Sequence, residues 1–592
     1  MDQLRPLRAR HQLTDLDIHF ADLMGRLAGE PGATLLLAAA LCSHATGEGH
    51  VCLQLGDLAG QLFDDSPQWR QQLMDSGVVG PPGSFYPLIL DPDGRLYLYR
   101  YWDYESRLAQ ELLQRSRMQA PAPPDRALKS LLERLFPPAP GLQTNWQKVA
   151  AATALLRNFT LVSGGPGTGK TSVVVRILAL LQAQAGDAGC RIALAAPTGK
   201  AAARLQESIS RARDALPLEP ASRQQIPDQA VTLHRLLGMR SNAAGFRHDR
   251  NNPLPLDALI LDEASMVDVA LMSRLLQALP RQARLILLGD RHQLSSVEAG
   301  AVLGDICGDA GGFSPAFRAT LQALTGEAVP AGAGSPGPLS DSIVFLQHSF
   351  RFTGDSGIGR LSDAIRQGDS NQALALLQSE TDPTLRLLEE TQILPYAIAG
   401  FADYLRLVQE GGAPERVFEA FRRFRILTAL RRGPQGAQGL NQALERAMTD
   451  QGLLRAGGDW YSGRPVMILQ NDYNLRLYNG DIGILLGGEG AAARVCFPAA
   501  DGSIRRVAPS RLPLHETAFA MTVHKSQGSE FERVLLLLPE LDLPLISREL
   551  IYTAVTRARR EFLICGPNDV LRAAVQRRTR RSTGLRDALW RP

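Results

Sequence analysis

A glycine-rich turn between an apolar run and a helical pattern constrains this chain more than any other feature. Residues 159–171 read FTLVSGGPGTGKT, and apolar residues then recur every three to four positions over 173–181. The turn matches G-x-x-x-x-G-K-[ST], and all of it is expected to contact a nucleotide: Gly164, Gly165, Pro166, Gly167, Thr168, Gly169, Lys170 and Thr171. Backbone N–H groups in such a turn, together with the following helix N-terminus, bind phosphate oxygens. The stretch therefore predicts a nucleoside triphosphate site, with Lys170 on the β- and γ-phosphates and Thr171 as a Mg²⁺ ligand.

Length and composition favour a multidomain protein without a membrane segment. A chain of 592 residues exceeds a single hydrophobic core, since such cores stop growing near ~250–300 residues. The N-terminal sequence MDQLRPLRARHQ lacks an apolar signal core, and no run of about 20 apolar residues follows. Six scattered cysteines without a C-x-x-C pair argue against a zinc site and suit reduced thiols, so a cytoplasmic protein is expected.

Residues 1–120 are predicted to form a mainly helical N-terminal domain. Helical patterns include Ala33–Cys42 and Arg107–Arg117, and no catalytic motif lies in this part of the chain. The domain is therefore our candidate for docking partner proteins. Two proline clusters around a short helix predict a linker at 121–141.

Residues 142–340 are predicted to form an α/β unit. Apolar runs at Arg191–Ala196, Ala258–Leu261 and Arg284–Leu288 alternate with helical patterns. This alternation is typical of a parallel sheet covered by helices on both faces. A polar stretch at 241–255 interrupts it as a small hairpin or a loop.

A second α/β unit is predicted over 341–592. Apolar runs recur at Arg425–Thr428, Val534–Leu538 and Glu561–Cys565. Between them, residues 463–512 show short alternating runs and the turn dipeptides Asn479-Gly480 and Asp501-Gly502, which predicts a small β-barrel-like insertion. The last stretch, 572–591, carries seven arginines; a solvated helix face is favoured over a phosphate-contacting patch.

Two apolar strands end in polar groups suited to nucleotide hydrolysis. The run LILDE places a carboxylate at a strand's end beside the phosphate loop, so Asp262 is expected to ligate Mg²⁺. Glu263 would then position or activate the attacking water. The run LLGDRHQL likewise places Asp290 and Gln293 near the γ-phosphate.

The ordered motifs resemble those of superfamily-1 helicases, and within them the RecD-type subunits of RecBCD helicase-nucleases. They are GGPGTGKT, APTGKAAARL, LDEASM, GDRHQL, HSFRF, TVHKSQGSEF and YTAVTRAR, and the resemblance runs from about Asn145 to Cys565. The N-terminal run SHATGEGHVCL also resembles this subunit type. The resemblance implies an α/β fold of two RecA-like P-loop NTPase motor lobes. It also implies that the insertion at 463–512 is an SH3-like β domain of the second lobe and that 241–255 is a small pin-like insertion of the first.

The resemblance also implies a role for individual residues. Gln147 is expected to read adenine, and Glu530 to lie near the ribose. Arg351 and Arg557 are expected to reach the γ-phosphate from the second lobe. They would complete a hydrolytic set with Lys170, Asp262, Glu263 and Gln293. The residues expected along the single-stranded DNA path are Thr198, Lys200, Thr232, His234, Thr522, His524 and Lys525.

The activity implied is that of an ATP- and Mg²⁺-dependent helicase or translocase moving 5′ to 3′ on single-stranded and duplex DNA. It would be the motor subunit of a heterotrimer with RecB-like and RecC-like chains, acting in double-strand break repair, recombination and degradation of linear DNA. No acid lies two residues before any of the five lysines, so the Asp/Glu-x-Lys pair of the relevant metal-dependent nucleases is missing and the nuclease site is expected in another chain.

Two alternative functions remain open at the level of sequence. The first is a nucleotide-dependent DNA clamp or assembly subunit with little unwinding of its own, although the complete hydrolytic set favours the motor. The second is an RNA helicase of the same superfamily, because phosphate contacts do not report the sugar.

Overall fold

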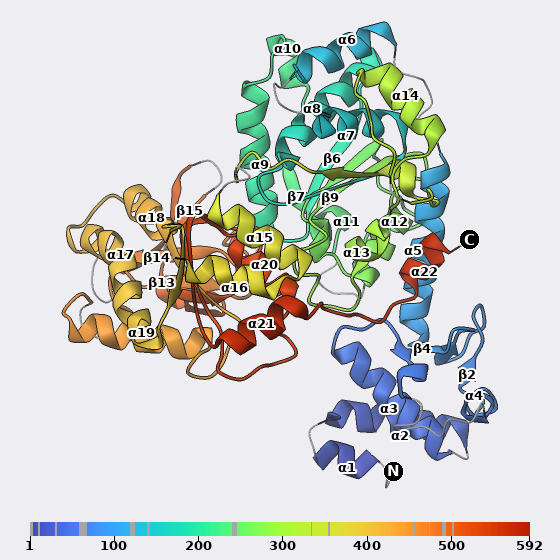
Figure 1. Ribbon diagram of the computed structural model, residues 1–592, viewed down its shortest axis with the longest axis horizontal. Coiled ribbons are helices and arrows are strands. Elements are labelled where there is room, and N and C mark those ends of the chain that lie inside the picture. The colour runs from blue at the N-terminus through green and yellow to red at the C-terminus, as the bar shows by residue number, and fades with distance from the viewer. Residues whose placement is uncertain are drawn as a thin grey trace.

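Two α/β units and an N-terminal domain make up the molecule (Figure 1). The computed structural model describes residues 4–591 except 10–11, 30–31, 59–67, 119–124, 139–142, 240–244, 309, 333, 353–355, 380, 455–457, 473, 488–492 and 500–501. Parts of the predicted linker (121–141), of the 241–255 insertion and of the Asp501-Gly502 turn therefore lie outside the described residues. Within the described part of the chain, no helix is both long and apolar enough to cross a membrane.

The first lobe is built on a six-stranded, fully parallel sheet in the order β10-β5-β9-β8-β6-β7. Its strands are β5 (Phe159–Gly164), β6 (Ile192–Ala196), β7 (Ala230–Thr232), β8 (Ala258–Leu261), β9 (Arg284–Gly289) and β10 (Ile343–Leu346). Successive residues Leu161 and Val162 of β5 belong to different buried clusters, one on each face of the sheet. Burial on both faces explains why these strands read as continuous apolar runs.

Helices cover both faces of this sheet. They are α6 (Arg126–Leu135), α7 (Trp146–Leu156), α8 (Lys170–Ala185), α9 (Gly199–Asp214), α10 (Pro220–Gln224), α11 (Leu233–Leu237), α12 (Val269–Ala278), α13 (Val302–Cys307) and α14 (Pro315–Thr325). The predicted strands at 191–196, 258–261 and 284–288 are confirmed as β6, β8 and β9. Because β10 pairs with β5, the first lobe extends past the predicted boundary at residue 340.

The second lobe is built on a five-stranded parallel sheet in the order β11-β20-β19-β12-β18. Its strands are β11 (Leu385–Leu388), β12 (Phe424–Thr428), β18 (Ala520–Thr522), β19 (Phe531–Leu537) and β20 (Ala558–Cys565). Its helices are α15 (Gly357–Gln367), α16 (Ser370–Gln378), α17 (Ile393–Gln409), α18 (Pro414–Arg423), α19 (Ala437–Asp450), α20 (Arg548–Val555) and α21 (Asn568–Gln576). The apolar runs predicted as strands in this lobe are β12, β19 and β20.

The predicted β insertion is a small antiparallel sheet in the order β16-β15-β14-β13-β17. Its strands are β13 (Pro465–Ile468), β14 (Ile482–Leu486), β15 (Arg494–Pro498), β16 (Ile504–Val507) and β17 (His515–Thr517). It has a core of its own that includes Val466, Val495 and Phe497. The SH3-like relationship of this sheet stays a prediction.

The N-terminal domain combines helices with a small sheet that sequence reasoning did not predict. The helices are α1 (Leu4–Ala9), α2 (Asp15–Ala28), α3 (Ala33–Gly47), α4 (Gln68–Met74) and α5 (Tyr99–Arg117). The sheet, in the order β1-β4-β3-β2, consists of β1 (Leu53–Gln54), β2 (Val79–Gly80), β3 (Leu88–Leu90) and β4 (Arg95–Leu98). These strands are too short to give a clear alternating pattern.

The long helix α5 joins the N-terminal domain to the first lobe. Its residue Arg115 is fully buried and donates hydrogen bonds to the carbonyl oxygens of Leu279 at 2.7 Å and Ala283 at 3.0 Å, just beyond the end of α12. The next helix, α6, buries Leu128 and Leu132 in the first-lobe core. Helices α5 and α6 are therefore both packed against the first lobe, although α6 falls within the predicted linker.

The C-terminal tail returns from the second lobe to the other two domains. Its last helix, α22 (Leu585–Trp590), packs on α5 and α13 and buries Leu585 and Leu589, in contrast to the solvated helix face that the arginines favoured. The red tail beside blue α5 is visible in Figure 1. The tail thus connects chain segments that the sequence places in different domains.

Candidate nucleotide and DNA site between the lobes

The phosphate loop lies between β5 and α8, at the carboxyl end of the parallel sheet. Two of its glycines have left-handed backbone conformations, Gly167 with φ 77° and Gly169 with φ 81°. A Cβ atom on Gly167 would lie 2.2 Å from the Cβ of Arg351, and one on Gly169 would lie 2.2 Å from Nε2 of Gln147. Both backbone conformation and close approach therefore require glycine at these positions.

The residues predicted to contact the nucleotide surround this loop. Lys170 Nζ donates to the carbonyl oxygens of Gly164 at 2.5 Å and Gly165 at 3.1 Å. Gln147, near the start of α7, donates from Nε2 to the carbonyl oxygen of Thr168 at 2.9 Å. The structure thus brings Gln147 and the phosphate loop together, and the adenine-reading role stays a prediction.

The two acids of the LILDE run follow directly after β8. Asp262 Oδ1 accepts a 2.9 Å hydrogen bond from the backbone N–H of Glu263. Glu263 has φ 52°, a left-handed conformation that is uncommon for a residue with a side chain and is typical of strained functional sites. Burial and the neighbouring Glu263 carboxylate raise the pKa of Asp262, against a lowering contribution from Lys170. A pair of acids in this situation favours a bound cation.

Asp290 and Gln293 connect the first lobe to α20 of the second. Gln293 Nε2 donates to Asp290 Oδ2 at 3.2 Å, and the Tyr552 hydroxyl donates to the same oxygen at 3.1 Å. The backbone N–H of Leu294 donates to Thr553 Oγ1 at 3.0 Å. Asp290 and Leu294 of the first lobe are therefore hydrogen-bonded directly to α20 of the second lobe.

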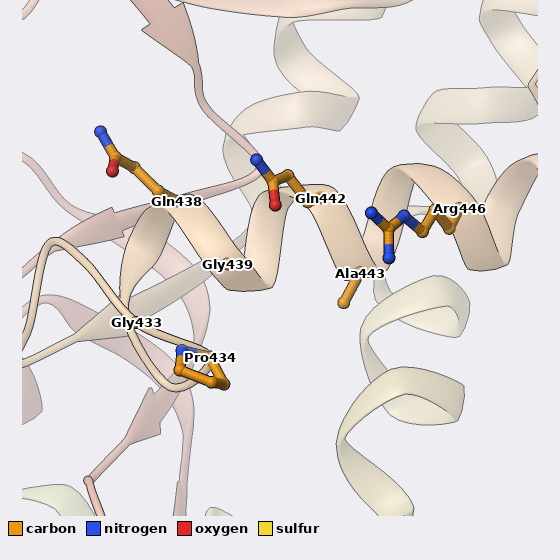
Figure 2. A pocket seen from close by; sticks show the side chains of 7 residues that line it. All are labelled: Gly433, Pro434, Gln438, Gly439, Gln442, Ala443 and Arg446. Carbon is orange, nitrogen blue, oxygen red and sulfur yellow. The ribbon is translucent and has the colours of Figure 1, made fainter.

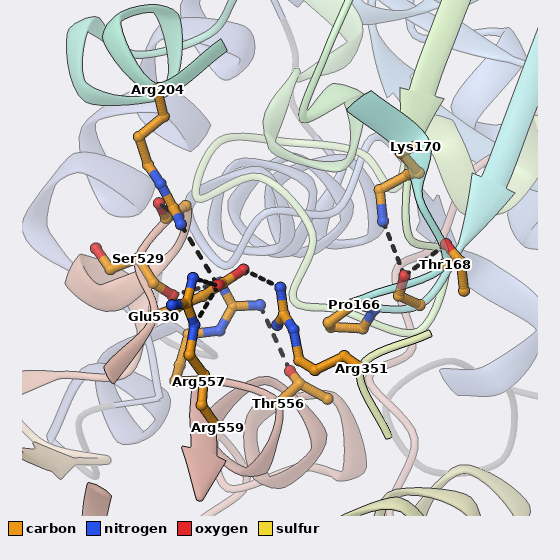
Figure 3. A network of polar contacts seen from close by, with 12 residues as sticks. Pro166, Thr168, Lys170, Arg204, Arg351, Ser529, Glu530, Thr556, Arg557 and Arg559 are labelled. Carbon is orange, nitrogen blue, oxygen red and sulfur yellow. Dashed lines mark hydrogen bonds and ion pairs between the residues drawn. The ribbon is translucent and has the colours of Figure 1, made fainter. Parts of the chain in front are cut away.

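Arg351 lies in the segment that joins β10 of the first lobe to α15 of the second, where the backbone N–H of Phe350 donates to Gly167 O at 2.8 Å. Its Nη2 donates to Glu530 Oε1 at 2.6 Å (Figure 3). Its Nη1 is buried and has no hydrogen-bond partner in the part of the chain that the structure describes. Arg351 is thus one arginine finger candidate that reaches the loop from the interlobe segment.

Glu530 is surrounded by further arginines (Figure 3). Arg559 donates to its Oε2 from Nε at 2.9 Å and from Nη2 at 2.6 Å, and Nη2 of Arg204 lies 3.6 Å from the same oxygen. Burial raises the pKa of Glu530, but the guanidinium groups of Arg351 and Arg204 outweigh it and bring that pKa to about 2. Glu530 is therefore ionised and interacts with arginine side chains from both lobes.

Arg557, the second predicted arginine finger, is buried beside Glu530. Its Nη1 donates to Ser529 O at 3.1 Å and its Nε donates to Thr553 O at 3.1 Å. Burial lowers its pKa, while the charges of Glu263 and Glu530 raise it. The charge of Glu263 acts on Arg557 although the two residues belong to different lobes.

The predicted DNA-path residues lie at the carboxyl ends of neighbouring strands. Thr198 caps α9 by accepting from Ala201 N at 3.2 Å, and Thr232 caps α11 by accepting from Arg235 N at 3.3 Å. Thr198 follows β6 and Thr232 ends β7; because these strands are adjacent and parallel, Lys200 and His234 lie at the same edge of the sheet. Thr522 ends β18, and His524 and Lys525 follow it at the corresponding edge of the second lobe.

The turn between β13 and β14 of the small sheet touches two of these positions. Lys525 Nζ donates to Asn479 Oδ1 at 2.8 Å, and a Cβ atom on Gly480 would lie 3.9 Å from Cδ of Lys200. Next to Lys200, a Cβ atom on Gly199 would lie 2.6 Å from the ring of Tyr478. Lys200 and Lys525 are therefore half-buried against the small sheet in this conformation.

A separate pocket of about 410 Å³ lies at the start of α19 in the second lobe (Figure 2). It is lined by Gly433, Pro434, Gln438, Gly439, Gln442, Ala443 and Arg446. One guanidinium and two amides are its functional groups, and it has no acid or hydroxyl to hydrolyse a phosphate. The residues predicted to act in hydrolysis lie instead around the phosphate loop, in the cleft between the lobes.

The fold and this cleft define a class of protein: a two-lobe P-loop NTPase with the motor lobes of a superfamily-1 helicase. Family models agree, with an "AAA domain" matching residues 147–299 and a "UvrD-like helicase C-terminal domain" matching 517–565. The model "RecBCD enzyme subunit RecD, N-terminal domain" matches residues 9–97. The chain belongs to the RecD family of RecBCD enzyme subunits, because its relatives there match it over nearly their whole length.

Two such relatives are each named RecBCD enzyme subunit RecD. The one from Mycolicibacterium smegmatis is 39% identical over 98% of this chain and 97% of its own length. The one from Haemophilus influenzae is 35% identical over 98% of both chains. The ATP-dependent RecD2 DNA helicase of Deinococcus radiodurans is 33% identical, over 72% of this chain and 50% of its own.

Three residues of the cleft were not assigned a role from sequence. Arg204, Tyr552 and Arg559 lie within the motifs APTGKAAARL and YTAVTRAR, yet nothing in those runs separates them from ordinary polar residues. The spacing of Arg204, four residues after Lys200, was a usable signal, since it places both side chains on one face of a helix.

Proposed function

We propose that the chain is an ATP- and Mg²⁺-dependent DNA helicase that translocates 5′ to 3′. It acts as a motor subunit of a RecBCD-type helicase-nuclease in double-strand break repair, recombination and degradation of linear DNA. The observation that carries this proposal is that residues expected to act in hydrolysis come together from both lobes and the segment between them. The charge of Lys170 acts on Asp262, that of Glu263 acts on Arg557, and Arg351 lies against Gly167 of the phosphate loop.

Arg351 supports phosphate chemistry most directly. Its buried Nη1 lacks an acceptor among the described residues, and the Arg351 Cβ packs against Gly167 of the phosphate loop. An orphaned buried donor is costly, so a phosphate oxygen is the natural acceptor. Arg351 and Arg557 then stabilise charge that develops on the transferred phosphoryl group, and Glu263 positions the attacking water.

The donor set also fits Mg²⁺. This ion binds protein through one or two hard oxygen ligands and takes its other ligands from water and substrate phosphates. Thr171 supplies a hydroxyl and Asp262 a carboxylate at the same end of the sheet. Bound Mg-ATP supplies the phosphoanhydride bond that the cleft residues act on.

DNA would cross the sheet edges of both lobes. Hydroxyls and lysines such as Thr198, Lys200, Thr522 and Lys525 suit contacts to phosphate without base readout, which a translocating motor needs. Opening and closing of the cleft would move these two sets of contacts relative to each other.

The N-terminal domain is proposed to dock the RecB-like and RecC-like subunits. The outer face of α2 exposes Leu16 at 73% and Leu27 at 58%, an unusual apolar surface for a domain without a catalytic motif. Because α5 packs on the first lobe, a truncation should remove residues 1–98 and keep α5. The shortened chain should lose co-purification with the two partners and keep ATP hydrolysis; an intact heterotrimer would refute this role.

The activity itself is tested by ATP hydrolysis with and without single-stranded DNA and RNA. Lys170→Gln should abolish DNA-stimulated hydrolysis, and Lys129→Gln, which alters an exposed lysine of α6, should leave it unchanged. Retained hydrolysis in Lys170→Gln would show that the phosphate loop is misassigned. Stimulated hydrolysis that opens no duplex, even with partners present, would favour the clamp, and stimulation by RNA alone would favour an RNA helicase.

A further inference from the structure

We propose that Arg204 is a positioning residue that makes ATP hydrolysis depend on DNA. It links helix α9, which begins in the DNA path, to Glu530, which holds the arginine finger Arg351. The inference rests on the proposed function and adds to it a residue and a physical route between the two sites.

Arg204 crosses from the first lobe to the second. Its Nη1 donates to the carbonyl oxygen of Gly528, and its Nη2 lies 3.6 Å from Glu530 Oε2. Figure 3 shows the side chain extending from α9 toward the glutamate. The two contacts fall on a short loop whose Gly528 has φ 67°, so the loop turns its carbonyl and its carboxylate toward the same guanidinium.

The helix that carries Arg204 is suited to transmit a displacement. Leu205 and Ile209 are buried in the first-lobe core, so the helix is fixed to the first lobe and would move with it relative to the second. Lys200 lies in its first turn, four residues before Arg204, and the two side chains therefore share one face. They are also electrostatic neighbours, because burial and then the Arg204 charge lower the pKa of Lys200 to about 7. A DNA phosphate at Lys200 would thus act on the helix face that carries Arg204.

The carboxylate of Glu530 interacts with both Arg204 and Arg351. Its side chain is 15% exposed, and that of Arg351 is 22% exposed. Oε1 accepts from Arg351, whereas Oε2 faces Arg204 and Arg559. A shift of the Arg204 guanidinium relative to Oε2 changes how Glu530 is oriented, and with it where Arg351 is held.

Arg204 and Arg351 therefore have different roles. With DNA bound, α9 and Arg204 hold Glu530 so that Arg351 can reach the phosphoryl group of ATP. Arg204 itself touches neither the nucleotide nor the reacting atoms in this scheme. Its loss should therefore lower the DNA-dependent rate and leave the apparent KM for ATP within about twofold.

The test uses the full-length chain and measures ATP hydrolysis across a titration of single-stranded DNA. Arg204→Ala is expected to lower the ratio of stimulated to unstimulated rate at least fivefold, and Arg204→Lys should restore part of it. Arg211→Ala is the matched control, since Arg211 lies on the same helix but is 77% exposed and, among the described residues, pairs with Glu207. The double variant Arg204→Ala/Glu530→Gln should show the same ratio of stimulated to unstimulated rate as Glu530→Gln alone, because both changes remove the same interaction between Arg204 and Glu530.

The outcomes separate this inference from the proposed function. If the unaltered chain shows no DNA stimulation, the proposed function fails. If it is stimulated and Arg204→Ala keeps the ratio within twofold, the inference is overturned. Equal loss of the rates with and without DNA, or additive effects in the double variant, would also overturn it. Melting temperatures within about 2 °C of each other exclude a folding defect, and Arg204→Lys remains as a second variant if Arg204→Ala does not fold.

Discussion

Arg351 binds Glu530 through Nη2 at 2.6 Å while its Nη1 has no acceptor in the described part of the chain. One half of the guanidinium is thus held by the second lobe, and the other half remains for a ligand beside the phosphate loop. Under the proposed function, a single arginine in this geometry would contact the γ-phosphate and the second lobe at the same time.

Replacing Arg351 by alanine should lower kcat for DNA-stimulated ATP hydrolysis by about 10³-fold, the usual contribution of an arginine finger. Arg351→Lys should restore little of the lost kcat, because a single ammonium group cannot make the contacts that the two Nη atoms of the guanidinium group make. Arg360→Ala, which breaks an ion pair of an arginine 47% exposed on α15, is the control and should be neutral. Steady-state kinetics decide the point; an Arg351→Ala enzyme within tenfold of normal would remove Arg351 from the reaction.

Gln147→Ala should raise the KM for ATP roughly tenfold, the effect of losing about one hydrogen bond to the base, with little change in kcat. Discrimination against GTP should fall at the same time, because the amide can read a purine edge. Competition between ATP and GTP in one hydrolysis assay measures this. Unchanged nucleotide preference would leave Gln147 with only its hydrogen bond to Thr168 O.

The tail should contribute to stability through buried apolar contacts. Leu589 is fully buried between α5 and α13, so Leu589→Ala should cost about 2–4 kcal/mol of unfolding free energy. Leu541→Ala, at a position that is 72% exposed, should be close to neutral. Chemical denaturation distinguishes the two; equal effects would show that the tail is not docked as described.

Stability should also depend on pH at the tail. Glu105 accepts hydrogen bonds from Thr583 Oγ1 and Gly584 N, both at 2.8 Å. Burial raises the pKa of Glu105 to about 7 and that of nearby Asp305 to about 8. The folded state therefore holds protons that the unfolded chain releases above about pH 4–5. The resulting contribution to the free energy of unfolding is complete at low pH and is lost as pH rises through 7 to 8.

Glu105→Gln tests whether stability falls as pH rises because of Glu105. The amide keeps an acceptor for Gly584 N and cannot ionise, so the variant should gain melting temperature relative to the unaltered protein as pH rises from 5 to 9. Thermal melts across that range provide the measurement. A difference between the two proteins that stays constant, or shrinks, over the same range would contradict the role of Glu105.

Sequence reasoning found the central strands because they are buried on both faces. β6, β8 and β9 read as continuous apolar runs. The edge strand β7 is only half-buried along its length and gives no such signal. The short N-terminal strands and the path of the tail depend on tertiary contacts, such as that between Ser582 and Val51.

The site was predicted in part for the same reason. Lys170, Asp262 and Gln293 come after the carboxyl ends of strands, where motif and period predict them, and their chemical roles stay predictions. The pairing of Arg204 with the 528–530 loop joins residues more than 300 positions apart, and no local pattern contains it. The left-handed backbone of Glu263 is likewise a property of the folded turn.

Unwinding of tailed duplexes with Mg-ATP, by the chain alone and with its partner subunits, tests the account most directly. The proposed function predicts that duplexes with a 5′ single-stranded DNA tail are opened and that the chain alone does not open those with a 3′ tail. The Lys170→Gln variant should open neither duplex. Opening of the 3′-tailed duplex by the isolated chain, or no opening of either duplex while DNA-stimulated hydrolysis proceeds with all partners present, would contradict it.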